Sequence, residues 1–220
     1  MLSFFAAKGG VGCSVVAAAT AVLASARTPT LLVDLSGDLA SLLGLSDPEG
    51  GEPLGIVDWL NAENPLPDSL RRIERRVTDS LALLPLGSGA FSPRPDQARL
   101  LARLLSADGR MVVVDVGLRA QVGVAILDAS QRTALVTRSC YLALRAARRG
   151  PEPDDVVLVA EPGRALSAKD VAAAIGSPVG PIVRWDPSIS RAVDAGLLVS
   201  RLPRPLRELE VLIPSLNPAA

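Results

Sequence analysis

Residues 8–14, with the sequence Lys-Gly-Gly-Val-Gly-Cys-Ser, constrain the fold of this chain more than any other segment. Three closely spaced glycines let successive backbone N–H groups turn toward an anion, and a helix after them adds the positive end of its dipole. An apolar run at residues 2–7 precedes the glycines, and an Ala/Val-rich stretch without a helix breaker follows at residues 14–26. This order of strand, glycine-rich loop and helix predicts a phosphate-binding loop. A tight turn that holds no ligand is the alternative.

The loop departs from the usual pattern at one position. A lysine normally follows the last glycine and reaches the outer phosphates, and the next Ser or Thr ligates magnesium. Ser14 is present here, whereas Cys13 stands in the place of the lysine. A hydrogen bond to a charged group is worth about 1.5–3 kcal/mol, so its loss should weaken triphosphate binding by about 10- to 150-fold. Cys13 is either a reactive thiol or a small residue that fills the space of the lysine.

With Lys8 included, the loop resembles that of the ParA/MinD-like partition and positioning ATPases, which carry an extra lysine just before the glycine pair. Only two of the 23 basic residues of the chain are lysines, Lys8 and Lys169, which favours a specific role for Lys8. The resemblance implies that Lys8 crosses a dimer interface and touches the nucleotide of the partner. A solvated surface lysine is the alternative.

Residues 31–44 are similar to the second motif of that family, in which a strand ends in Asp-x-Asp and runs into Leu-Leu-Gly. Asp34 matches the first aspartate, but the second, which in the family orients the attacking water, is Ser36 here. Asp38 lies two residues further on, and near-attack geometry tolerates little displacement of a carboxylate. We therefore expect hydrolysis to be slow or absent.

Two later segments also resemble the family. Residues 111–117 look like its third motif, an apolar strand whose Asp115 would hold a magnesium-bound water, although such an aspartate can also cap a turn. Residues 185–197 are similar to its late segment near the nucleotide base. The strand-end Asn that the family uses for adenine has no counterpart in residues 156–162, so base recognition is not supported.

Apolar runs alternate with helical stretches, and this alternation predicts an α/β fold. The expected architecture is a doubly wound, mostly parallel sheet with helices on both faces, as in P-loop NTPases. We expect strands at residues 2–7, 30–34, 81–86, 111–115, 133–137, 156–160 and 178–183. Carboxyl ends of parallel strands meet at one edge, so Lys8, Asp34 and Asp115 should converge there. A length of 220 residues with 49% hydrophobic residues suits one core, and we expect a single domain over residues 1–220.

The composition narrows the classes of partner and location. Acidic and basic residues balance at 23 each, so the net charge gives no reason for an obligatory nucleic-acid or anionic-lipid partner. Two cysteines without any histidine indicate neither a metal motif nor a disulfide framework. We see neither a secretory signal nor a membrane span, and predict a cytoplasmic location. Residues 205–213 are short and mixed in charge, which makes a poor lipid anchor, so we expect them to pack on the domain or bind a protein.

A cluster of arginines offers a second kind of surface. Arg71, Arg72, Arg75 and Arg76 follow helical spacing and predict a basic stripe on one helix. The stripe either contacts DNA phosphates, as in ParA-like relatives, or is a solvated helix face.

These patterns predict a MinD/ParA-like positioning or partition-type regulatory protein with a degenerate nucleotide site. We expect a pseudo-ATPase that acts as a homodimer or recruits a protein partner, and that binds ATP or ADP with Mg²⁺ weakly or not at all. Two alternatives stay open: an active ATPase of the same family in chromosome or plasmid partition or septum placement, and a non-specific DNA-binding partition protein. The candidate nucleotide-binding residues are Lys8, Gly9, Gly10, Val11, Gly12, Cys13 and Ser14; the candidate metal ligands are Ser14 and Asp115; the candidate catalytic residues are Lys8, Asp34 and Asp38.

Overall fold

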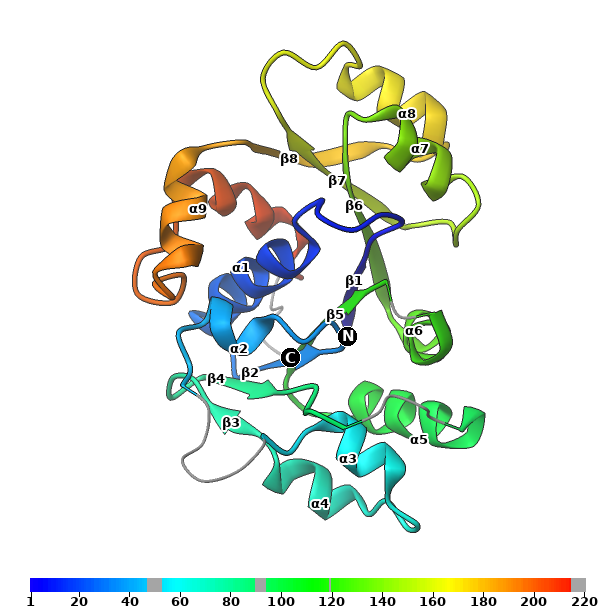
Figure 1. The fold of residues 1–220 in the computed structure, drawn as a ribbon, viewed down its shortest axis with the longest axis vertical. Helices are drawn as coiled ribbons and strands as arrows, with labels where there is room; N and C mark the ends of the chain where they lie inside the picture. The colour runs from blue at the N-terminus through cyan, green and yellow to red at the C-terminus, as the bar shows by residue number, and fades with distance from the viewer. Residues whose placement is uncertain (47–52, 90–93, 119, 215–220) are drawn as a thin grey trace, which may run out of the picture.

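The computed structural model describes residues 1–46, 53–89, 94–118 and 120–214, and these form an α/β fold around one eight-stranded sheet (Figure 1). The strand order is β3-β4-β2-β5-β1-β6-β7-β8. All neighbouring pairs are parallel except β3 with β4, which confirms the predicted mostly parallel sheet. The strands are β1 (Leu2–Phe5), β2 (Thr30–Asp34), β3 (Arg75–Arg76), β4 (Leu81–Leu84), β5 (Met111–Gly117), β6 (Arg132–Arg138), β7 (Asp155–Ala160) and β8 (Val179–Arg184).

Helices cover both faces of the sheet, as predicted for a doubly wound fold (Figure 1). Successive strand residues point to opposite faces, so Val113 of β5 packs in one core cluster while Val112 and Val114 pack in the other. The first face carries α1 (Cys13–Ser25), α2 (Leu39–Leu42), α9 (Pro187–Asp194) and the 3-10 helix η1 (Arg204–Leu212). The second face carries α3 (Ile56–Asn61), α4 (Pro67–Arg72), α5 (Pro95–Ser106), α6 (Ala120–Ala129), α7 (Tyr141–Ala147) and α8 (Ala168–Ile175).

All seven predicted strands are present, although β1 and β4 end two residues earlier than predicted and β5 runs two residues further. The prediction that the four arginines form a basic stripe on one helix is wrong. Helix α4 ends at Arg72, and Arg75 and Arg76 form the edge strand β3, antiparallel to β4. Their guanidinium groups are also engaged, because Arg76 pairs with Asp79 and Arg75 donates to the Ser46 carbonyl. A two-residue strand is too short to leave a periodic signal in the sequence.

The C-terminal segment packs on the sheet layer rather than projecting from it. Leu206, Leu209 and Leu212 of η1 are buried in the same core cluster as α1. This confirms that residues 205–213 pack on the domain. Within the described ranges, no helix combines the length and apolar character needed to cross a bilayer.

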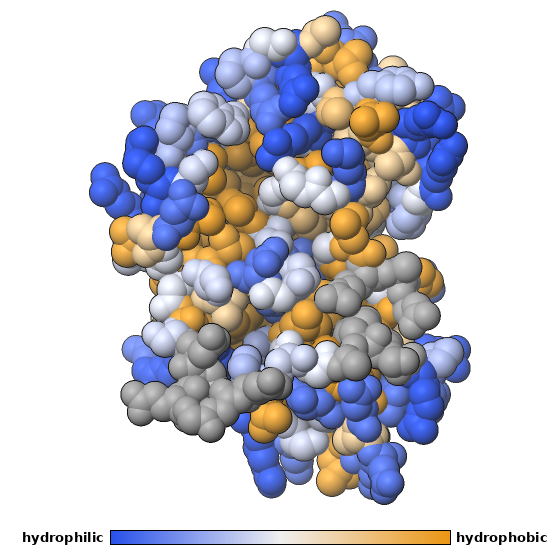
Figure 2. Space-filling model, viewed as in Figure 1, coloured by the Kyte–Doolittle hydropathy of each residue, from blue (hydrophilic) through white to orange (hydrophobic). Residues whose placement is uncertain are grey.

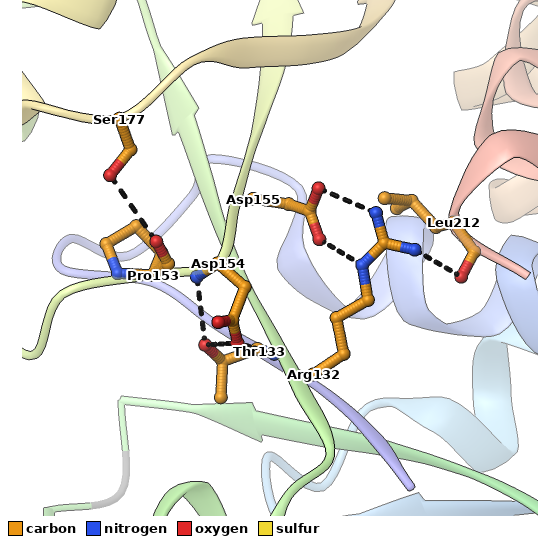
Figure 3. A network of polar contacts seen from close by, with 7 residues as sticks. All are labelled: Arg132, Thr133, Pro153, Asp154, Asp155, Ser177 and Leu212. Atoms are coloured by element: carbon orange, nitrogen blue, oxygen red, sulfur yellow. Dashed lines mark hydrogen bonds and ion pairs between the residues drawn. The ribbon is translucent and has the colours of Figure 1, made fainter. Parts of the chain in front are cut away.

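Polar contacts at the amino ends of β6 and β7 hold this C-terminal segment in place (Figure 3). The Arg132 guanidinium donates to Asp155 through Nε at 2.5 Å and Nη2 at 2.8 Å, and its Nη1 lies 3.3 Å from the Leu212 carbonyl oxygen. Beside this pair, Asp154 accepts from the backbone N–H and the hydroxyl of Thr133, both at 2.8 Å. The network lies at the sheet edge opposite the phosphate loop, so its role is in the fold.

Candidate functional site

The predicted phosphate loop connects β1 to α1 at the carboxyl edge of the sheet. Gly10 and Gly12 have φ angles of 75° and 95°, in the left-handed region where only glycine is unstrained. Gly12 is the N-cap of α1, and its carbonyl accepts the Val16 N–H at 3.0 Å. The N–H groups in the first turn of a helix have no partner within the helix, so they can bind an anion. The loop therefore has the backbone of a phosphate cradle.

A cavity of about 730 Å³ opens at this loop, a volume in the range of small-molecule sites. All seven predicted nucleotide-binding residues line it, as does Asp38. Sequence reasoning missed a group of lining residues from elsewhere in the chain: Ser41, Leu42, Leu118, Val193 and Asp194. The resemblance at residues 185–197 was the available signal for the last two.

A second cavity, of about 200 Å³, lies against the same loop on the α9 side. Its walls include Val159, Val183 and Ile189, and Figure 2 shows a hollow with hydrophobic walls in this region, beside α9. Trp185, which is 48% exposed, also lines it. The segment at residues 185–197 thus adjoins the loop.

Two carboxylates lie side by side at this edge of the sheet. Asp34 and Asp115 end their apolar stretches in register on the neighbouring strands β2 and β5, and are 1% and 0% exposed. Lys8, Asp34 and Asp115 do share this edge, as predicted. Lys8, however, is exposed at the rim of the cavity, whereas the two carboxylates are buried.

The Asp34 carboxylate faces backbone rather than cavity. Its Oδ1 accepts the N–H groups of Ser36 at 2.9 Å and Gly37 at 2.7 Å, and its Oδ2 accepts the Leu39 N–H at 3.0 Å. Burial raises the pKa of Asp34, and these N–H donors act in the opposite direction. The residue therefore fixes the turn between β2 and α2.

Ser36 occupies the centre of the site. Its Oγ lies 2.6 Å from Asp115 Oδ2, 3.0 Å from Asp34 Oδ1 and 3.3 Å from the Ser14 hydroxyl. Sequence reasoning treated Ser36 only as a missing aspartate. The structure places its hydroxyl between the two buried carboxylates and the start of α1, with Asp115 as the nearer acceptor of its single proton.

Cys13 and Asp38, two further predicted residues, lie in opposite environments: Cys13 is buried and Asp38 is exposed. Burial, followed by the charge of Asp115 and a hydrogen bond to it, raises the pKa of the Cys13 thiol well above its ordinary value. Asp38 is exposed at the N-cap of α2, and its side chain makes no capping hydrogen bond. Its carboxylate therefore faces solvent at the cavity, away from the buried pair.

The two cysteines should differ sharply in reactivity toward a thiol-alkylating reagent. Cys13 is buried with a raised pKa, whereas N–H groups of Ala143 and Leu142 lower the pKa of Cys140. Only the thiolate reacts, so Cys140 should be modified at least about tenfold faster, with a half-maximal rate below the ordinary thiol pKa. Mass spectrometry of timed samples measures both rates, and unfolded protein, in which the two should react alike, is the control. Faster labelling of native Cys13 would contradict this assignment.

No protein-family model matches the chain, and no curated protein matches it either. Solved structures do match. A ParA family ATPase from Chlorobium tepidum aligns over 96% of this chain and 95% of its own, with a TM-score of 0.74 and 22% identity. MinD in the MinC:MinD complex of Aquifex aeolicus aligns over 100% and 98%, with a TM-score of 0.75 and 17% identity. The Pyrococcus horikoshii septum site-determining protein MinD, complexed with Mg-ADP, aligns over 96% and 93%, with a TM-score of 0.73 and 17% identity.

These similarities run over nearly the full length of this chain and of each matched chain. At sequence identities of 17–22% they establish the fold. The chain therefore has the fold of the ParA and MinD ATPases, with its glycine-rich loop at the carboxyl edge of the sheet.

Proposed function

We propose that this chain is a positioning or partition-type regulatory protein whose nucleotide site binds weakly and hydrolyses slowly or not at all. Its structural neighbours include a ParA family ATPase and the cell division protein MinD. One neighbour is complexed with Mg-ADP and another with MinC, which supports a nucleotide ligand and a protein partner for this chain. The protein would act through dimerisation or partner recruitment in the cytoplasm.

The observation that carries the proposal is the contrast between the loop backbone and its side chains. The backbone keeps the left-handed glycines and a cavity of about 730 Å³. The position for the phosphate lysine instead holds a buried thiol that contacts Asp115. Of the described residues that line the cavity, Lys8 alone carries a positive charge. Anion binding by N–H groups remains, while charge stabilisation of a leaving phosphate is reduced.

Replacing Cys13 with lysine tests this proposal. Cys13→Lys should tighten ATP binding by about 10- to 150-fold, because a charged donor returns to the phosphates. Turnover should rise much less, since Ser36 still stands where the family has an aspartate for the attacking water. Titration calorimetry measures the affinity and a phosphate-release assay measures turnover.

Cys140→Lys is the matched control, because it adds the same charge outside the residues that line the cavity. Thermal melts should show both variants folded. An equal gain in affinity from the two substitutions would contradict the assigned role of position 13, and a large rise in turnover from Cys13→Lys alone would contradict that of Ser36.

An active ATPase is the second candidate, favoured by the solvent-facing carboxylate of Asp38 and the amine of Lys8 at one cavity. It predicts steady phosphate release by the wild-type protein that is lost in Asp38→Ala and Lys8→Ala. Absence of release in the wild type supports the pseudo-ATPase.

DNA binding through residues 71–76 is less favoured, since these arginines do not form one helical stripe. A DNA-binding protein would still show affinity that falls steeply with salt and with Arg71→Glu.

A further inference from the structure

The Ser36 hydroxyl stands at the point where the two predicted magnesium ligands approach each other. It lies 3.3 Å from the Ser14 hydroxyl and 2.6 Å from Asp115 Oδ2. A magnesium ion held by Ser14 would reach Asp115 through one of its waters. The Ser36 hydroxyl already donates to Asp115 the hydrogen bond that such a water would donate. The protein thus supplies from its own chain the link that a hydrated metal would make.

Hydrogen-bond donors also compensate the two buried carboxylates. Such a pair would ordinarily attract a cation, because burying carboxylates without compensation is costly. Asp34, however, accepts three backbone N–H groups, at 2.7–3.0 Å. Asp115 accepts from the Gly117 N–H at 3.2 Å and from the Ser36 hydroxyl at 2.6 Å. The charge that a metal would balance is therefore already stabilised by hydrogen bonds.

Ser36 is anchored through its backbone and lies close to β5. Its own N–H is bonded to Asp34, and a Cβ placed on Gly117 would lie only 3.2 Å from the Ser36 Cβ. Gly117 has no Cβ, and this allows β5 to pass close to the serine. Magnesium demands near-octahedral geometry at about 2.0–2.1 Å and keeps several waters, so it would have to displace this hydroxyl. Among the described residues, no cluster of three or more His, Cys, Asp or Glu side chains could hold a metal instead.

We propose that Ser36 makes this site metal-independent, so that a nucleoside di- or triphosphate binds the loop N–H groups and Lys8 without magnesium. This inference rests on the proposed nucleotide-binding function. It assigns Ser36 the role of a built-in substitute for the hydrated metal. The hydrogen bonding around Ser14 and Asp115 therefore does not fit the Mg²⁺ that the fold would suggest.

The first experiment measures ADP affinity of the wild-type protein by calorimetry, with excess Mg²⁺ and with EDTA. The two dissociation constants should agree within about threefold, and a larger gain with Mg²⁺ would overturn the inference. Loss of ADP binding under both conditions would instead reject the proposed nucleotide function. The two failures are therefore distinguishable.

The second experiment does not need nucleotide, because it titrates the protein with Mn²⁺ alone and follows the free ion by electron paramagnetic resonance. Ser36→Asp adds a third carboxylate beside Asp34 and Asp115, and should bind Mn²⁺ at least about tenfold more tightly than the wild type. Ser41→Asp adds the same charge at the exposed part of the cavity and should remain close to the wild type. Binding of Mn²⁺ by the wild type as tight as by Ser36→Asp would overturn the inference, as would an equal gain from Ser41→Asp. Thermal melts confirm that each variant is folded.

Discussion

Asp34→Ala should lower the free energy of unfolding by about 3 kcal/mol, because it removes the acceptor of three backbone N–H groups at once. The hydrogen bond from the Leu39 N–H to Asp34 is buried, so water cannot replace the carboxylate oxygen as its acceptor. Part of the loss is offset because a buried carboxylate, whose pKa is raised by that burial, is also removed. Chemical denaturation of the variant and the wild type measures the difference.

Asp38→Ala is the matched control for this prediction. Asp38 is four residues away on the same turn, exposed, and makes no capping hydrogen bond, so the variant should stay within about 0.5 kcal/mol of the wild type. Asp34→Asn keeps one acceptor oxygen and should fall between the two. If Asp34→Ala were no less stable than Asp38→Ala, the carboxylate would not be what holds the turn. The two substitutions also separate a structural from a catalytic effect at these neighbouring candidate residues.

Gly55→Ala should cost about 3 kcal/mol or more of stability, for a reason unrelated to φ. The φ of Gly55 is −159°, which any residue adopts, but a Cβ there would lie 2.2 Å from the Gly87 nitrogen and 2.3 Å from the Leu86 carbonyl carbon. Both neighbours are backbone atoms, so no side-chain rotation relieves the clash. The Val57 N–H donates to the Leu86 carbonyl at 2.9 Å, and this bond docks α3 against the segment after β4. The clash should separate these two segments.

Gly109→Ala is the control, because a Cβ at Gly109 meets no atom within 4 Å and its φ lies outside the left-handed region. The glycine-to-alanine change is the same, so any effect on the unfolded chain is shared by both variants. Thermal and denaturant unfolding should therefore show a loss in Gly55→Ala and little change in Gly109→Ala. Equal stability of the two variants would mean that α3 and the segment after β4 can move apart without cost.

The sequence by itself determined the glycine-rich loop between β1 and α1, the seven main strands and the doubly wound sheet. Each of these features has a signal in consecutive residues. The loop is marked by glycines between a strand and a helix, and the strands by unbroken apolar runs that suit burial on both faces. The convergence of Lys8, Asp34 and Asp115 at one edge also followed, because parallel strands place all their carboxyl ends together. The sequence also showed directly that Cys13 and Ser36 differ from the residues of the ParA/MinD-like motifs.

Only the tertiary structure decided what those departures do. The Ser36–Asp115 contact joins residues 79 positions apart, and it exists because β2 and β5 are neighbours in the sheet. The presence of Asp194 at the cavity likewise depends on a segment distant in sequence. Helices and strands can be predicted from the sequence because the spacing of their apolar residues is a pattern among residues close together in the chain. The partners that a polar side chain finds on a neighbouring strand are set by which elements pack together, and no local pattern encodes them.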